Sequence, residues 1–219
     1  VRIAMTVGTL GNSIGLRMHS DQETSLGDGA YDVFLKPQRG LINSDLRIGP
    51  DITSVIRLQS NNEISNRGFC LFGAGFLVSQ DVAKNLGLGT VSDVDRYVKK
   101  YRNGRDITDK SRDLYVIDLF GLSVEVLISQ FPMIYQHVLE RVKPERDNNK
   151  RASRKRNWWI FGEPNPKLRV QINNLQRYIA TVETAKHRTF QFLDASICPD
   201  NRLVVIASES AWLLSVLSS

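Results

Sequence analysis

The sequence changes pattern near Ser79, and this change most limits the folds open to the chain. Before it, short β-branched or aromatic runs separated by glycine and proline are typical of strands. These runs lie at residues 2–7, 31–35, 53–58, 69–72 and 75–78. After it, capped helical segments alternate with further short strands. We therefore expect an α+β fold, with short and mostly antiparallel strands in small sheets and flanking helices from about residue 80 onward.

Capping residues define the first two expected helices. Ser79 precedes a helix over residues 80–86, and Ser92 precedes one over residues 93–101. Further helices are expected at residues 123–130, 132–142, from Pro144 through the following basic segment, and at 167–175 and 208–217. Strands are expected between them at residues 115–120, 177–182, 189–194 and 203–207.

Composition places the chain among ordinary globular proteins. Its 219 residues, 42% of them hydrophobic and 24% charged, are enough to bury a core without disulfides or metal. No apolar run approaches the roughly 18 residues of a membrane span, and no signal pattern opens the chain. Cys70 and Cys198 are far apart, which fits a reducing compartment, so we expect a cytoplasmic protein with no membrane partner. Because the chain opens on Val1 rather than Met, we expect a piece of a longer protein.

Positive charge is concentrated in one segment. The formal net charge is +6, and the segment from Arg141 to Arg156 holds eight basic residues against two acids, so the rest of the chain sums to zero. If this segment is helical, its cations form a stripe that can follow a phosphate backbone. The alternative is a solvated surface helix. Trp158 and Trp159, which follow, either flank the cations or belong to the core. The candidate backbone contacts in this segment are Arg146, Lys150, Arg151, Arg154, Lys155 and Arg156.

Signatures of catalysis and of metal binding are missing from the sequence. The three histidines lie too far from other His, Cys or paired carboxylates to form a usual metal site. The sequence has neither a nucleophile elbow nor an Asn-Pro-Pro-aromatic run of the kind that holds a flipped base. We therefore assign no catalytic residue, no metal and no cofactor to this chain. An enzyme built from dispersed carboxylates such as Asp118, Glu125 and Asp194 remains an alternative.

Two polar clusters suit binding. Arg102, Asn103 and Arg105 surround a tight turn that can approach phosphate closely, although the turn is equally well explained as a helix C-cap. A loop between two expected strands offers donors and acceptors for several base edges, although it is also typical of a polar hairpin loop. The candidate base-reading residues in this loop are Glu183, Thr184, Lys186, His187 and Arg188.

Several strings then resemble the specificity region of bacterial single-chain restriction-modification DNA methyltransferases of the MmeI type. They are YRNGRD at 101–106, VIDLFG at 116–121, RVKPERD at 141–147, WWIFGEP at 158–164, RYIATVETAKHR at 177–188 and LLSVLSS at 213–219. The resemblance runs in order along the whole chain. It implies that residues 37–219 are a DNA target recognition domain whose C-terminus is truncated, and that residues 1–36 are the end of, or the link from, a methyltransferase domain.

The resemblance also implies a parent activity. In that family a methyltransferase domain of the same chain uses S-adenosylmethionine to methylate an adenine at N6, and the target recognition region grips double-stranded DNA. Base readout in the family falls in the segment that matches residues 183–188. A structural scaffold between the methyltransferase and partner domains remains an alternative, with the basic stripe facing acidic protein.

Overall fold

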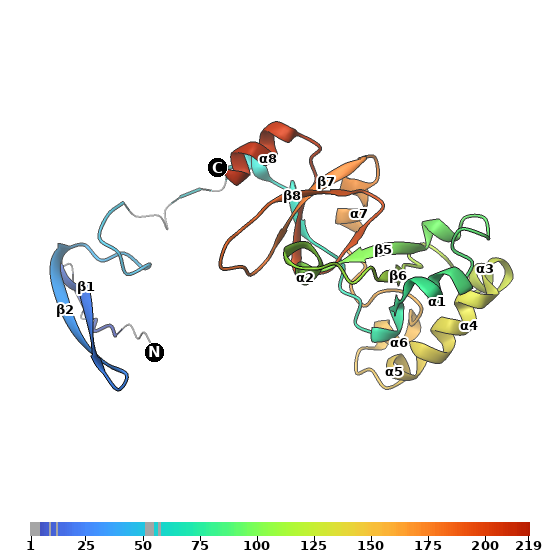
Figure 1. The fold of residues 1–219 in the computed structure, drawn as a ribbon, viewed down its shortest axis with the longest axis horizontal. Coiled ribbons are helices and arrows are strands. Elements are labelled where there is room, and N and C mark those ends of the chain that lie inside the picture. The colour runs from blue at the N-terminus through green and yellow to red at the C-terminus, as the bar shows by residue number, and fades with distance from the viewer. Residues whose placement is uncertain (1–4, 9, 12, 51–54, 57) are drawn as a thin grey trace. The chain divides into compact units, whose positions relative to one another are not determined.

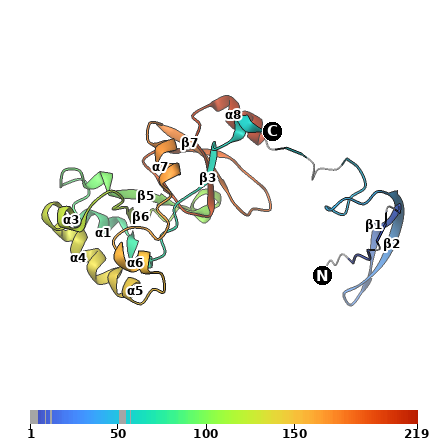
Figure 2. The same cartoon turned by 180° about the vertical axis from the view of Figure 1, so that it is seen from behind.

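The computed structural model describes residues 5–8, 10–11, 13–50, 55–56 and 58–219, which form two compact units, residues 1–59 and residues 60–219. The expected boundary after residue 36 falls inside a strand of the first unit. The assignment of the two segments to methyltransferase and recognition domains stays a prediction. Figures 1 and 2 show the elements of each unit from opposite sides.

The first unit is built on a two-stranded antiparallel ribbon. Strand β1 (Gly15–Gly27) pairs with β2 (Ala30–Gly40) through a tight turn at Asp28 and Gly29, both of which have positive φ. An Asp-Gly pair is a strong hairpin signal, but β1 was not expected from the sequence. The expected strand at residues 31–35 is confirmed within β2. Of the expected strands at 2–7 and 53–58, residues 2–4, 53–54 and 57 lie outside the described residues, and the remainder form no strand.

The second unit contains two four-stranded sheets. The first has the order β3 (Ser65–Arg67), β10 (Leu203–Ile206), β7 (Arg177–Val182) and β8 (Gln191–Asp194), and all of its pairs are antiparallel. The second has the order β4 (Leu77–Val78), β6 (Tyr115–Ile117), β5 (Val98–Arg102) and β9 (Cys198–Pro199), with a parallel β5–β9 pair. Consecutive strands β9 and β10 therefore lie in different sheets.

Helices lie beside both sheets of the second unit. The expected α+β class is therefore confirmed. Near the second sheet lie α1 (Gln80–Asn85), α3 (Val124–Gln130), α4 (Pro132–Arg141), α5 (Lys143–Asp147) and α6 (Ala152–Arg156) (Figure 1). Helices α7 (Pro166–Ile172) and α8 (Ala211–Ser218) lie beside the first sheet, and α2 (Gly104–Thr108) follows β5. The Ser79 side chain caps α1, as predicted. Ser123 and Ser210, which were expected inside helices at 123–130 and 208–217, cap α3 and α8 instead.

The expected helix over residues 93–101 is wrong. Only a 3-10 turn (Val94–Arg96) forms there, and strand β5 follows it. Val98 and Tyr101 are buried, while the β5 backbone pairs with β6 and β9. These pairings join segments far apart in the sequence, so they override a local helical signal. Likewise, residues 69–72 form no strand, and Phe69 and Cys70 make isolated bridges only.

Candidate nucleic-acid interface

The two polar clusters that the sequence singles out meet at one hollow, which Asn103 and Arg105 line from the first cluster and Glu183 and Thr184 from the second. The other candidates of these clusters, Arg102, Lys186, His187 and Arg188, do not line it. This hollow, of about 560 Å³, is bounded by the start of α2 on one side and by the beginning of the β7–β8 loop on the other. The two segments are in direct contact. The Gln191 side chain donates to the Ile107 carbonyl at 3.1 Å. A Cβ on Gly104 would lie 3.0 Å from Val182 Cγ1, so glycine permits this close approach. Chain segments far apart in the sequence thus form one surface.

The start of α2 is held by a buried carboxylate. Asn103 caps the helix by accepting from the Asp106 backbone N–H, and Asp106 accepts from the Asn103 N–H at 3.0 Å in return. Arg112 donates to both oxygens of Asp106, each at 2.9 Å. Burial by itself would raise the pKa of Asp106, but the hydrogen bonds from Arg112 and from backbone N–H groups outweigh it and lower the pKa to about 2. The carboxylate is therefore charged at neutral pH and fixes the turn.

Among the candidate backbone contacts of this turn, only Arg105 keeps its head group available. Arg102 donates to Asp113 at 3.2 Å and to a backbone carbonyl, and Asn103 is occupied as the cap. Arg105 is exposed, and none of the residues that the structure describes pairs with its guanidinium. Arg105 therefore suits an external anion, whereas Arg102 and Asn103 mainly shape the turn.

The β7–β8 loop, residues 183–190, also divides into fixed and available side chains. Arg188 donates to the carbonyls of Val182 and Glu183 at 3.2 and 3.1 Å, which closes the base of the loop. The Glu183 carboxylate pairs with Arg67 at 2.5 Å. The three remaining candidates are exposed and make no hydrogen bond or ion pair with the described part of the chain: Thr184, Lys186 and His187.

The prediction of one continuous basic helix is wrong, because two short helices, α5 and α6, form there instead. Helices α5 and α6 are separated because Asn148 and Asn149 bond locally to the backbone: Asn148 Nδ2 donates to the Pro144 carbonyl and Asn149 Oδ1 accepts from the Arg151 N–H, both at 3.0 Å. Two residues of the expected stripe, Arg146 and Arg154, are withdrawn from the surface.

Arg146 is fully buried, so it is not a backbone contact. Its guanidinium donates to the carbonyls of Leu71 and Ile160, each at 3.0 Å. Arg154 lies with its guanidinium carbon 3.5 Å from the centroid of the Phe72 ring, and its side chain is only 10% exposed. The cations of this segment that stay exposed are Arg141, Lys150, Arg151, Lys155 and Arg156.

The tryptophans that follow the basic segment belong to the core. Trp158 is buried, and Trp159 Nε1 donates to the Leu122 carbonyl at 2.9 Å. The two rings pack edge to face with centroids 6.1 Å apart. Of the two interpretations open at the sequence level, the core interpretation is correct.

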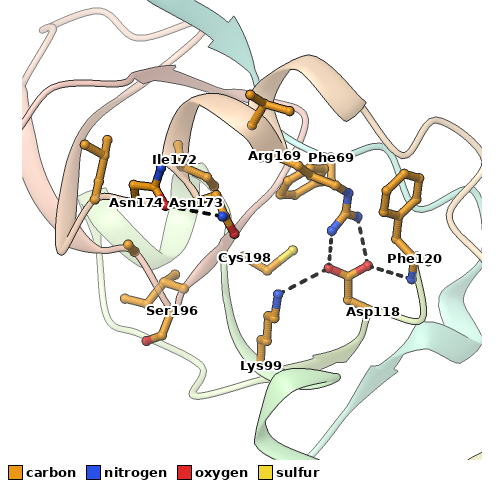
Figure 3. A pocket seen from close by; sticks show the side chains of 14 residues that line it. Phe69, Lys99, Asp118, Phe120, Arg169, Ile172, Asn173, Asn174, Ser196 and Cys198 are labelled. Carbon is orange, nitrogen blue, oxygen red and sulfur yellow. Dashed lines mark hydrogen bonds and ion pairs between the residues drawn. The ribbon is translucent and has the colours of Figure 1, made fainter. Parts of the chain in front are cut away.

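A second hollow, of about 660 Å³, surrounds a buried ion pair (Figure 3). Arg169 donates to both oxygens of Asp118 at 2.7 and 2.8 Å, and Lys99 lies 3.6 Å from the same carboxylate. The Arg169 guanidinium also lies between the rings of Phe69 and Phe120, 4.4 Å from each centroid. This arrangement saturates Asp118 and joins α7 to the second sheet.

Two of the three carboxylates considered for a hidden enzyme are occupied by partners within the chain. Asp118 is bound by Arg169, and Asp194 accepts from the Ser196 hydroxyl at 2.6 Å. Glu125 lies in the first turn of α3. Burial raises the pKa of the Cys198 thiol well above its ordinary value, which keeps it protonated. Within the described ranges, no three His, Cys, Asp or Glu side chains are close enough to hold a metal ion.

Sequence reasoning missed four polar residues of this surface. Arg112 and Arg202 line the hollow beside α2, while Arg67 and Asn201 line a smaller neighbouring hollow of about 360 Å³. Asn201 follows Asp200 in a turn, which is a local signal for an exposed tip. Nothing local marks Arg67, because its partner Glu183 is brought close only by the folding of the first sheet. Arg112, by contrast, pairs with Asp106 only six residues before it.

No helix in the described part of the chain is both long and apolar enough to cross a membrane. No family model and no curated protein matches the chain. Among solved structures it is similar to the type IIL restriction-modification enzyme MmeI, determined in complex with DNA, with 15% identity and a TM-score of 0.65. The match covers 94% of this chain but 31% of that enzyme, so this chain spans about a third of its length. The fold of the chain is therefore related to that of a segment of this enzyme.

Proposed function

We propose that this chain recognises a DNA target sequence on behalf of a bacterial adenine-N6 DNA methyltransferase of a restriction-modification system. One observation carries the proposal. The α2 turn and the beginning of the β7–β8 loop line one hollow, in which the exposed Arg105 side chain has no partner among the described residues. Lys186 and His187, farther along the same loop, are also exposed and without such a partner. Cations without internal partners suit phosphate, and a mixed set of donors suits base edges.

The fold supports the same proposal. The solved structure with a related fold is a restriction-modification enzyme bound to DNA. In this proposal, methyl transfer from S-adenosylmethionine belongs to a methyltransferase domain of the same polypeptide. Residues 60–219 then position the duplex through Arg105, Lys155 and their exposed neighbours, and residues 184–187 read bases.

The test is binding to a labelled random-sequence duplex pool by fluorescence anisotropy at several salt concentrations. The affinity of the chain should fall steeply with salt, because each phosphate contact releases counterions. Replacing Arg105 and Lys155 by Ala should flatten the salt slope by about two. The control replaces Lys84 on α1 and Arg96 in the turn before β5, two exposed cations outside the proposed interface, and should leave the slope unchanged.

Two results contradict the proposal. One is the absence of binding even at low salt. The other is an equal loss in the two variants, which would mean that net charge alone drives association. If binding is found, selection from the same pool should yield a preferred sequence. Replacing Lys186 and His187 by Ala should then relax discrimination at a base position by about 1–3 kcal/mol.

A second candidate, an interaction scaffold, is favoured by the first unit. One face of the β1–β2 ribbon carries exposed Leu16, Met18, Tyr31, Val33 and Leu35. An isolated two-stranded ribbon is marginally stable in water, so an apolar face of this kind suits contact with protein. Binding of a methyltransferase domain without any affinity for DNA would favour this candidate over recognition.

A further inference from the structure

The turn between β9 and β10 occupies the junction of the two sheets. Its first residue, Asp200, donates its backbone N–H to the Arg102 carbonyl at 2.8 Å, which connects the turn to the residues before α2. Its last residue, Arg202, accepts at its carbonyl from the Glu183 N–H at 2.8 Å, which connects it to the β7–β8 loop. The turn therefore lies between the two segments assigned to DNA contact above.

The backbone of this turn is rigid. Asp200 Oδ1 accepts from the Arg202 N–H at 3.0 Å, and Asp200 Oδ2 accepts from the Tyr101 hydroxyl at 2.6 Å. Burial, followed by this hydrogen bond, raises the pKa of Tyr101, so its hydroxyl keeps its proton. Gly68 packs directly against the turn, since a Cβ there would lie 2.2 Å from the Asp200 carbonyl oxygen. A side chain at Gly68 would displace the turn.

The side chains at the tip of this rigid turn make no internal bond. Asn201 lines the smaller hollow with Arg67 and Glu163, and Arg202 lines the hollow beside α2. Neither side chain has a hydrogen-bond partner within the ranges that the structure describes. Asn165, in the same hollow as Asn201, differs: its amide donates to the Arg67 carbonyl and accepts from the Leu168 N–H.

We propose that Asn201 and Arg202 are a second pair of base-reading residues, presented on a turn separate from the β7–β8 loop. An arginine can donate two hydrogen bonds to guanine O6 and N7, and an asparagine amide can both donate to and accept from adenine. A backbone held in place by hydrogen bonds positions such groups more precisely, and a side chain without an internal partner can bond to a base without first breaking another bond. This inference rests on the proposed function and assigns specificity to residues outside the loop.

The experiment is selection of preferred duplexes from the random pool by the whole chain and by its Arg202→Ala, Arg202→Lys and Asn201→Ala variants. Arg202→Ala should reduce the preference at one base position by about tenfold. That position should differ from the one relaxed by Lys186→Ala. Arg202→Lys should keep the salt slope but lose the same preference, because lysine lacks the planar fork.

Each outcome bears on the inference. A uniform loss of affinity in Arg202→Ala, with a salt slope reduced by about one and the preferred sequence intact, would overturn it and make Arg202 a phosphate contact. Unchanged preference in both the Arg202→Ala and Asn201→Ala variants would also overturn it, while binding and selection by the unmodified chain would leave the proposed function standing. Failure of the unmodified chain to bind any duplex would overturn both. Thermal unfolding should closely match the unmodified chain, since neither side chain makes a hydrogen bond or ion pair with the described residues.

Discussion

Replacing Asp106 by Asn tests how the start of α2 is held. The carboxylate accepts from the Asn103 N–H at 3.0 Å and from three donors of Arg112: its backbone N–H at 3.0 Å, and Nε and Nη2 at 2.9 Å each. The exchange keeps the shape of the side chain. It removes the charge and turns one acceptor into a donor that faces other donors.

The expected loss of unfolding free energy follows from the lowered pKa of Asp106. An ordinary aspartate has a pKa of about 3.9, and the bonds to Asp106 lower its pKa to about 2. The difference corresponds to about 2.5 kcal/mol of unfolding free energy at neutral pH. A carboxylate whose folded pKa is depressed contributes this stability above the unfolded pKa and loses it as the pH falls through the folded pKa. The gap between the native chain and Asp106→Asn should therefore be full above about pH 5 and close toward about pH 2.

Urea unfolding of both chains across this pH range measures the gap. The matched control is Asp109→Asn, which removes an exposed carboxylate at the end of the same helix and should change the unfolding free energy by less than about 0.5 kcal/mol. A gap below about 1 kcal/mol at neutral pH, or a gap of constant size down to about pH 2.5, would refute the reasoning.

Three further changes have expected outcomes. Arg169→Ala should cost about 3 kcal/mol in urea unfolding, because it leaves the Asp118 charge buried with a weaker partner. Arg188→Ala should weaken binding to the preferred duplex by anisotropy while changing thermal unfolding little, since it loosens only the base of the β7–β8 loop. Trp159→Phe should cost about 1–2 kcal/mol by urea unfolding, through loss of the bond to the Leu122 carbonyl, with unchanged affinity for DNA.

Local signals explain which helices the sequence predicts. Ser79, Ser123 and Ser210 each accept from a backbone N–H three residues on, so the cap and its helix lie within one short window. The same kind of signal failed at Ser92, whose position predicts a helix over residues 93–101, whereas Val98–Arg102 is a strand paired with β6 and the distant β9. The local capping signal in that window was overridden by pairing that only the folded chain supplies.

The two polar segments of the candidate site could be predicted from the sequence, but their meeting at one hollow could not. The polarity of the α2 turn and of the β7–β8 loop is visible in the sequence, but their shared hollow depends on the way β5, β7 and β9 are arranged. Whether an individual cation is buried or exposed also depends on distant parts of the chain. Arg146 is buried because the carbonyls of Leu71 and Ile160, from two other segments, accept from it.

The number of exposed cations without an internal partner limits how steeply DNA binding can depend on salt. Exposed cations of the proposed interface that have no ion pair or hydrogen bond with the described residues are Arg105, Arg141, Lys150, Lys155, Arg156, Lys186 and Arg202. Each phosphate contact contributes about 0.9 to the slope of log affinity against log salt, so this surface supports a slope of at most about 6. A base-reading role for Lys186 and Arg202 lowers that limit to between 4 and 5, roughly. A measured slope well above 6 would therefore require cations outside this surface, and would place the duplex on a wider or different face of the chain.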